Sequence, residues 1–101
     1  MILYHRTNRE SARQIEAHGF RDKSGYYLTE TIHSGVWLSD VPLDANDGVG
    51  GDVLLEVTVE LASSEIAEYE WVEEGRSFRE FLIPAAILNP VMQLRIVEGD
   101  E

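Results

Sequence analysis

The clearest strand pattern in the chain is the run Val53-Leu54-Leu55-Glu56-Val57-Thr58-Val59-Glu60-Leu61. Successive side chains of a strand point to opposite faces of its sheet. One face of this run is wholly apolar and consists of Val53, Leu55, Val57, Val59 and Leu61; the other is mixed and consists of Leu54, Glu56, Thr58 and Glu60. The pattern predicts a half-buried strand, in a sheet that covers a core with one face.

A short strand and a helix are predicted before this run. The strand is expected over residues 2–5, and Thr7-Asn8-Arg9-Glu10 then matches a capping box whose first hydroxyl caps the helix. The helix is expected to extend to about Ala17, where Gly19 ends it and Phe20 packs back on its last turn. The residues expected on its buried side are Ala12 and Ile15, with Ser11 and His18 beside them.

The remaining chain is predicted to form short strands and turns. Strands are predicted over residues 35–39, 68–72, 77–84 and 91–97, single helical turns over 62–67 and 85–88, a loop or ragged hairpin over 21–34, and an exposed loop over 40–52 with a turn at 46–48. We therefore expect one α+β domain over residues 1–97, followed by a frayed acidic tail over 98–101.

The balance of charge restricts the possible partners. The 101 residues carry nineteen Asp and Glu against eight Lys and Arg, which gives a net charge of -11. Such a surface repels phosphate backbones, so a protein that grips long nucleic acid is disfavoured. The same acidity is also consistent with a feature that only keeps the protein in solution.

Several kinds of site are excluded by what the chain lacks. Without cysteine there is no disulfide, no thiolate nucleophile and no Cys-type zinc site. His5, His18 and His33 have none of the close spacings of metal-binding pairs, so no metal site is expected. The chain has neither the apolar core of a signal peptide nor a membrane-spanning run, and a cytoplasmic protein without membrane contact is expected.

One carboxylate lies in an apolar strand pattern near the end of the chain. In Ser77-Phe78-Arg79-Glu80-Phe81-Leu82-Ile83-Pro84, alternation places Glu80 on the same face as Phe78 and Leu82. A carboxylate between apolar neighbours is costly to bury without a partner. Two interpretations follow: Glu80 is an edge-strand charge that faces water, or it is a carboxylate kept for chemistry.

Three ordered motifs resemble the ADP-ribosyltransferases of the poly(ADP-ribose) polymerase and diphtheria-toxin type. They are Leu3-Tyr4-His5-Arg6-Thr7, followed by a helix and Gly19-Phe20; Ser34-Gly35-Val36-Trp37-Leu38-Ser39-Asp40; and Arg79-Glu80-Phe81-Leu82-Ile83-Pro84 with its continuation to Pro90. The order of the three motifs is more specific than any one of them. The resemblance implies the fold of that family, with two packed, mostly antiparallel sheets and one main helix.

The resemblance also implies that NAD is a co-substrate and that particular residues have roles. Glu80 would be the catalytic carboxylate, His5 would hydrogen-bond the adenosine ribose of NAD and position the nicotinamide half, and Trp37 would stack beside the nicotinamide ring. Arg6, Thr7 and Ser39, which belong to or adjoin the same motifs, are assigned to NAD binding. Arg6 replaces the glycine that the family usually has, so its side chain would either reach the pyrophosphate or obstruct the pocket.

Alternatives remain open at this point. The acceptor of ADP-ribose is unknown and could be a protein or a small molecule. The same motifs would suit a non-catalytic NAD or ADP-ribose binding module, or an enzyme that resembles the NAD-dependent RNA 2'-phosphotransferases. Taken singly, His5 is an ordinary strand-end histidine, Trp37 is a core residue, and Arg76 and Arg79 either bind phosphate or pair with Glu70, Glu73 or Glu74.

Overall fold

The structure, a computed structural model, describes residues 1–25, 32–43 and 51–99. Its strands are β1 (Ile2–Thr7), β2 (Lys23–Gly25), β3 (His33–Ser39), β4 (Val53–Val59), β5 (Glu70–Trp71), β6 (Glu80–Ile83) and β7 (Met92–Glu98). Its helices are α1 (Arg9–His18), α2 (Ser63–Ala67) and α3 (Ala85–Leu88), and the 3₁₀ turn Asn89–Val91 follows α3. The predicted turn at 46–48 and the last two residues of the predicted tail lie outside the described residues.

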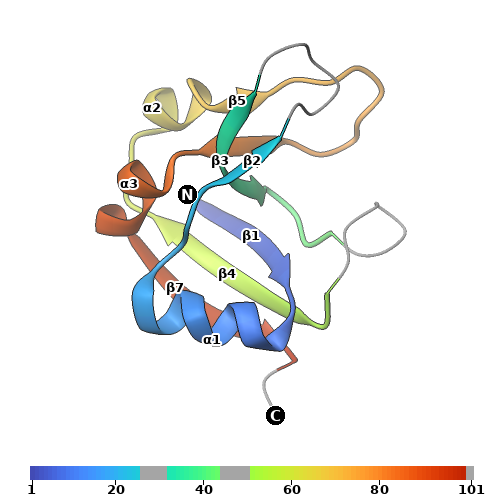
Figure 1. Cartoon of the computed structure of the whole chain (residues 1–101). Helices are drawn as coiled ribbons and strands as arrows, with labels where there is room; N and C mark the ends of the chain where they lie inside the picture. The colour runs from blue at the N-terminus through green and yellow to red at the C-terminus, as the bar shows by residue number, and fades with distance from the viewer. Residues whose placement is uncertain (26–31, 44–50, 100–101) are drawn as a thin grey trace.

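The described strands form one antiparallel sheet in the order β5-β6-β3-β1-β4-β7. The short strand β2 pairs with the N-terminal end of β3. The α+β class is confirmed, whereas the expected arrangement of two packed sheets is wrong. The pairing of Tyr4 with Ser39 joins β1 to β3 and makes the sheet continuous. It is the one residue pair in register between these strands in the described chain, compared with six between β1 and β4. The sheet therefore has two well-paired halves with a narrow connection (Figure 1).

The strand β4 has the faces that its sequence predicts, with one exception. Val53, Leu55, Val57 and Val59 are all buried, and Glu56 and Thr58 on the other face are partly exposed. Leu54 was expected on the mixed face with them, yet it is buried as well. The register places Leu54 opposite Arg6. Its burial therefore indicates a covered region on the outer face of the sheet.

The core lies on the other face of the sheet and is closed by the helices. Ala12 and Ile15 of α1 are buried against it, as predicted, while Ser11 is only half-buried and His18 is exposed. Figure 1 shows α1 crossing the half of the sheet formed by β1, β4 and β7. The largest fully buried side chains are Phe81, Leu3, Leu38, Leu55, Ile66, Ile83 and Leu88.

The N-cap of α1 differs from the prediction. Thr7 is the last residue of β1 and pairs with Val53, so its backbone belongs to the ladder. Asn8 is the N-cap instead, and its side-chain oxygen accepts a hydrogen bond of 2.8 Å from the backbone N–H of Ser11. Gly19 ends the helix as predicted, with a φ of 82° that favours glycine.

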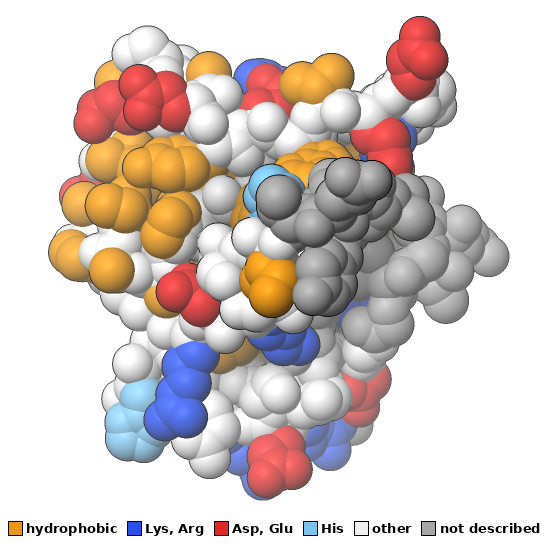
Figure 2. Space-filling view, turned by 45° about the horizontal axis from the view of Figure 1, so that its top comes forward, with side chains coloured by type: hydrophobic (Ala, Val, Ile, Leu, Met, Phe, Trp, Pro, Cys, Tyr) orange, Lys and Arg blue, Asp and Glu red, His pale blue; other side chains and the backbone are white. Residues whose placement is uncertain are grey.

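The surface charges do not gather in one patch on the face that Figure 2 shows. Carboxylates lie mainly at the upper corners and the lower edge of this view, and most of the visible arginine and lysine side chains lie in its lower half. No helix in the described parts of the chain is long and apolar enough to span a membrane. At the C-terminal end, β7 extends through Glu98, which was predicted to begin the frayed tail.

Candidate functional site

A cleft opens where the two halves of the sheet separate. It is lined by Tyr4, His5, Arg6, Trp37, Leu38, Ser39, Leu43, Leu54 and Glu80. The space between its walls is about 370 Å³ when the solvent at its open mouth is included. Five of the six predicted site residues line it, from three strands that are far apart in the sequence. Thr7, the sixth, lies in the ladder with Val53 and does not line the cleft.

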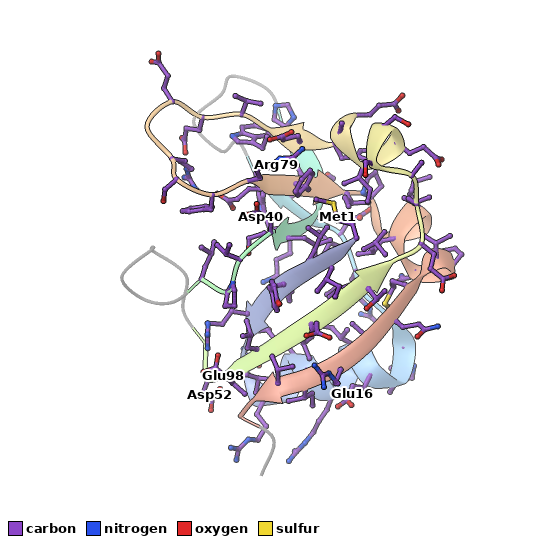
Figure 3. The ribbon with its side chains drawn as sticks, turned by 180° about the vertical axis from the view of Figure 1, so that it is seen from behind. Met1, Glu16, Asp40, Asp52, Arg79 and Glu98 are labelled. Atoms are coloured by element: carbon purple, nitrogen blue, oxygen red, sulfur yellow. The ribbon has the colours of Figure 1, made fainter. Side chains whose placement is uncertain are left out.

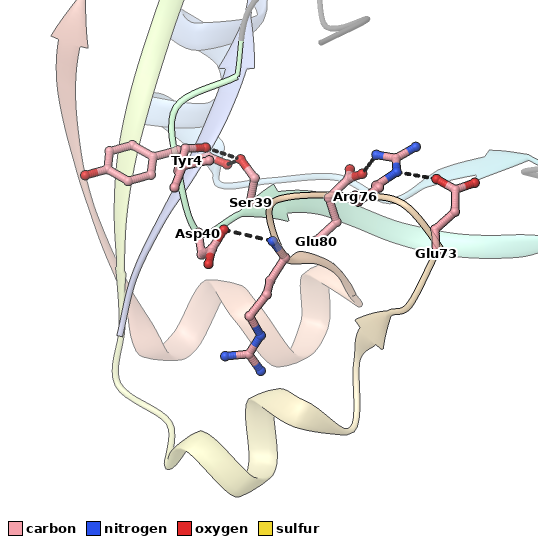
Figure 4. A network of polar contacts seen from close by, with 8 residues as sticks. Tyr4, Ser39, Asp40, Glu73, Arg76 and Glu80 are labelled. Atoms are coloured by element: carbon pink, nitrogen blue, oxygen red, sulfur yellow. Dashed lines mark hydrogen bonds and ion pairs between the residues drawn. The ribbon is translucent and has the colours of Figure 1, made fainter.

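Glu80 projects from an interior strand. β6 lies between β5 and β3, where Glu80 pairs with Trp71 on one side and Ser39 on the other. Its side chain is only 15% exposed, so the interpretation as an edge-strand charge facing water is wrong. One of its oxygens accepts a hydrogen bond from Arg76 (Figure 4), which explains how a carboxylate is tolerated there.

Arg76 joins Glu80 to the loop before β6. The guanidinium also pairs with Glu73, and it lies 5.2 Å from the centre of the Phe78 ring. With 38% of its side chain exposed, Arg76 is held mainly by contacts that water screens. Its pairing with Glu73 was foreseen among several alternatives, but its pairing with Glu80 was not, because an i, i+4 spacing predicts a pair only in a helix and Arg76 precedes a strand.

His5 lies at the connection between the two halves of the sheet. Its Nδ1 is 2.7 Å from the backbone carbonyl oxygen of Trp37. A carbonyl can only accept a hydrogen bond, so Nδ1 carries the proton and the neutral ring keeps Nε2 as its acceptor. In the described chain every buried side-chain nitrogen and oxygen has a partner. Among the described residues Nδ1 makes the one hydrogen bond of this ring, and Nε2 therefore lies within reach of solvent.

Burial lowers the pKa of His5 below its ordinary value. The hydrogen bond to the Trp37 carbonyl opposes this shift, and the charge of Lys23 adds to it. His5 is therefore neutral near pH 7, and it can accept a hydrogen bond from a ligand hydroxyl through Nε2.

Trp37 presents a half-buried aromatic ring to the cleft. Its ring centre is 5.4 Å from that of Trp71 at an angle of 76°, and Trp71 has a similar edge-on contact with His33. Such edge-on contacts restrict the orientation of the rings. Trp37 is thus neither a fully buried core residue nor a loose surface side chain.

Arg6 and Ser39 line the cleft, but their polar groups are engaged by the protein. The Arg6 guanidinium donates to the carbonyl oxygens of Leu43 and Gly51 and pairs with Glu98 at 3.2 Å. Figure 3 shows Glu98 beside Asp52 at one end of the sheet. The Ser39 hydroxyl donates to the carbonyl of Val41 at 2.7 Å. Both side chains therefore shape the wall of the cleft before any ligand contact is considered.

Four lining residues were not predicted as site residues: Tyr4, Leu38, Leu43 and Leu54. Tyr4 shares a cross-strand row with Ser39 and Glu80, because Ser39 is opposite both. Only the order of the strands reveals this row. The sequence pattern assigned Leu54 to the mixed face of its strand and Leu43 to an exposed loop. Their burial follows from the fold around Arg6.

The position of His5 predicts a pH dependence of stability. Because its pKa in the folded protein is below 6.5, the unfolded chain binds the proton more readily. The free energy of unfolding is therefore expected to fall as the pH drops through 6.5. Below the pKa of His5 in the folded protein, His5 contributes no further decrease. The hydrogen bond from Arg79 lowers the pKa of Glu70. Any effect of Glu70 on the pH dependence of stability therefore lies at pH values below 4.5, outside the range in which His5 titrates.

Denaturant titrations between pH 8 and pH 5 measure this effect. His5→Gln is expected to flatten the slope, because it removes the buried group that titrates in this range. Equal slopes in the wild type and in His5→Gln would contradict the assignment.

Comparison of the chain with protein-family models, with curated proteins and with solved structures gives no match. Within the described residues, no three His, Asp or Glu side chains are grouped as the ligands of a metal ion would be.

Proposed function

We propose that this domain is an ADP-ribosyltransferase that binds NAD in the cleft, cleaves the bond between nicotinamide and ribose, and transfers ADP-ribose to an acceptor. One observation carries the proposal. His5, Trp37 and Glu80, which the three sequence motifs single out, lie on β1, β3 and β6 and line the same cleft.

The chemistry of these side chains suits the reaction. Breaking the nicotinamide–ribose bond develops positive charge on the ribose, as in glycoside hydrolysis. The Glu80 carboxylate, in a partly water-excluded position, stabilises that charge and accepts a proton from the incoming acceptor. The Trp37 ring contacts the cationic nicotinamide ring, and such a cation–π contact contributes about 0.5–2 kcal/mol. His5 accepts a hydrogen bond from a ribose hydroxyl through Nε2.

The dimensions and charges of the cleft fit the nicotinamide-ribose end of NAD better than the whole molecule. Arg6 is the one cationic side chain in the described lining, and it is tied to protein carbonyls and Glu98. Arg76 is next to Glu80 and partly exposed, so its guanidinium can exchange a carboxylate for the pyrophosphate of NAD. The adenine base then lies outside the cleft.

Two measurements on the unmodified protein test the proposal. NAD is expected to raise the thermal unfolding temperature, since a ligand that binds only the folded state stabilises it in proportion to the logarithm of its concentration. Slow release of nicotinamide is expected on incubation. Trp37→Ala is expected to weaken NAD binding, and Trp37→Phe, which keeps a ring, is the matched control. Absence of both binding and release at millimolar NAD would overturn the proposal.

A non-catalytic NAD-binding module is the second candidate. The observation that favours it is the ion pair between Glu80 and Arg76, which occupies one carboxylate oxygen. A thermal shift with NAD and no nicotinamide release would support this candidate.

An RNA 2'-phosphotransferase is disfavoured by the engagement of arginine side chains. Arg6, Arg79 and Arg95 each pair with a carboxylate in the described structure. Arg79, for example, makes two hydrogen bonds with Glu70. These guanidinium groups would have to break their pairs to hold an RNA phosphate.

A further inference from the structure

We propose that Asn89 is a positioning residue for His5 and acts through Phe20, an inference that rests on the proposed function only for its effect on NAD. Asn89 follows α3 and is 84 residues from His5 in the chain. It makes no direct contact with His5 among the hydrogen bonds of the described residues. The connection consists of two successive contacts.

The first contact is a two-point hydrogen bond between Asn89 and the backbone of Phe20. The Phe20 N–H donates to Oδ1 of Asn89 at 2.8 Å, and Nδ2 of Asn89 donates to the Phe20 carbonyl at 2.9 Å. The amide thus binds Phe20 as a neighbouring strand would, and it fixes both the position and the direction of that peptide. Both bonds are partly buried, so an unpaired Phe20 backbone would be costly.

Gly19 makes room for this contact. A Cβ atom at Gly19 would lie 2.9 Å from the Cγ and Oδ1 atoms of Asn89, and φ at Gly19 is 82°. A side chain there would displace the amide as well as strain the backbone. The glycine that ends α1 therefore serves the Asn89 contact in addition to the helix terminus.

The second contact is between the rings of Phe20 and His5. Their centres are 5.1 Å apart and their planes meet at 84°, and Phe20 is only 4% exposed. A well-packed aromatic neighbour restricts rotation of the imidazole about its side-chain bonds. The Trp37 carbonyl holds Nδ1 on another side of the ring. The two restraints together keep the protonated Nδ1 on the carbonyl and Nε2 as the acceptor.

The surroundings of His5 define what its titration reports. The charged groups around it are Lys23, whose charge lowers the His5 pKa, and Arg6 and Glu80, which line the same cleft. None of these is altered by a change at Asn89. A change in His5 titration in an Asn89 variant therefore reports the packing of the ring and its access to water.

A second hydrogen bond between the same two chain segments provides a matched control. Oδ1 of Asp22 accepts a 2.7 Å hydrogen bond from the backbone N–H of Ala85, at the start of α3. Asp22→Ala removes a tether between these segments without touching Phe20. It is expected to cost stability, as Asn89→Ala does, and to leave His5 unchanged.

The experiment is nuclear magnetic resonance of the His5 imidazole in the full chain, without ligand, over a pH titration. In the wild type we expect the Nδ1–H tautomer. In Asn89→Ala we expect a mixture of tautomers and a pKa closer to 6.5, while Asp22→Ala resembles the wild type.

A wild-type His5 signal in folded Asn89→Ala would overturn the inference, as would an equal change in Asp22→Ala. If Asn89→Ala does not fold, Phe20→Leu gives the decision, because it keeps the backbone clamp and removes the ring; an unchanged His5 signal then overturns the inference.

Titrations with NAD separate this inference from the proposed function. If NAD binds the wild type, Asn89→Ala is expected to raise the apparent Kd about as much as Phe20→Leu does, and more than Asp22→Ala. If the His5 signal changes as expected but the wild type binds no NAD, the positioning role stands and the proposed function falls. If the wild type binds NAD but the His5 signal is unchanged in Asn89→Ala, the positioning role falls and the proposed function stands.

Discussion

Glu80→Gln is expected to reduce the rate of nicotinamide release by about 10²–10⁴-fold, the usual range for a catalytic acid–base or charge-stabilising group. Glutamine has nearly the same shape, so the cleft and the β6 ladder are kept, but its neutral amide cannot stabilise positive charge on a ribose carbon. The loss should appear in the rate at saturating NAD rather than in NAD affinity, because the interaction strengthens in the transition state.

Two controls make this result interpretable. Glu74→Gln removes a carboxylate from an exposed position in the loop before β6, and it is expected to leave the rate unchanged. Far-ultraviolet circular dichroism and the unfolding temperature show whether Glu80→Gln is folded, since Arg76 retains Glu73 as a partner. A Glu80→Gln protein that releases nicotinamide at the wild-type rate would rule out the proposed role of this carboxylate.

Phe81→Ala is expected to lower the free energy of unfolding by about 3–5 kcal/mol, the range observed when a buried aromatic side chain is truncated. Phe81 is completely buried in β6, between Leu38 of β3 and Glu70 of β5, and its ring lies 5.1 Å from the Arg79 guanidinium carbon. Since domains are stable by only about 5–15 kcal/mol in total, a change of this size brings the protein close to unfolding at room temperature.

Denaturant unfolding of the wild type and of Phe81→Ala under the same conditions measures the loss in the free energy of unfolding. Phe81→Leu, which fills most of the volume, is expected to lose less than half as much stability as Phe81→Ala, because the remaining cavity is smaller. A loss below about 1 kcal/mol in Phe81→Ala would be inconsistent with its complete burial.

The features of the fold that were predictable from the sequence are those with a local cause. The alternation in β4 follows from the geometry of a single strand, and the end of α1 at Gly19 follows from the conformational freedom of glycine. The choice between Thr7 and Asn8 as N-cap was not local in this sense. Both residues can cap a helix, and pairing of Thr7 with Val53 decides that Asn8 does.

The arrangement of the sheet was predicted less well, for a physical reason. An alternating strand buries its apolar face equally well in two packed sheets and in one sheet with a narrow connection. The alternation in the sequence therefore does not distinguish these two arrangements. The pairing of Tyr4 with Ser39 distinguishes the two arrangements, because it joins the two halves into one sheet. It is a contact between residues 35 positions apart in the chain. The burial of Leu54 has the same origin, since it depends on the neighbours Arg6 and Leu43 rather than on β4 itself.

The candidate site shows the same division. The motifs selected His5, Trp37 and Glu80, and all three line one cleft, but their catalytic roles stay predictions. Arg6 was expected either to reach the pyrophosphate or to obstruct the pocket; in the structure it lines the cleft, and its guanidinium binds Leu43, Gly51 and Glu98. A long, flexible cation takes the partners that the fold supplies, and these partners are distant in the sequence.

Glu80 shows most clearly what each level of structure determined. The sequence by itself placed this carboxylate on a strand among apolar residues, because the two-residue period of a strand assigns every side chain to a face. Only the tertiary structure decided that β6 is interior, that Ser39 and Trp71 are its neighbours, and that Arg76 holds one of its oxygens. A strand's own sequence fixes which way its side chains point, whereas their surroundings depend on chain segments that the period does not describe.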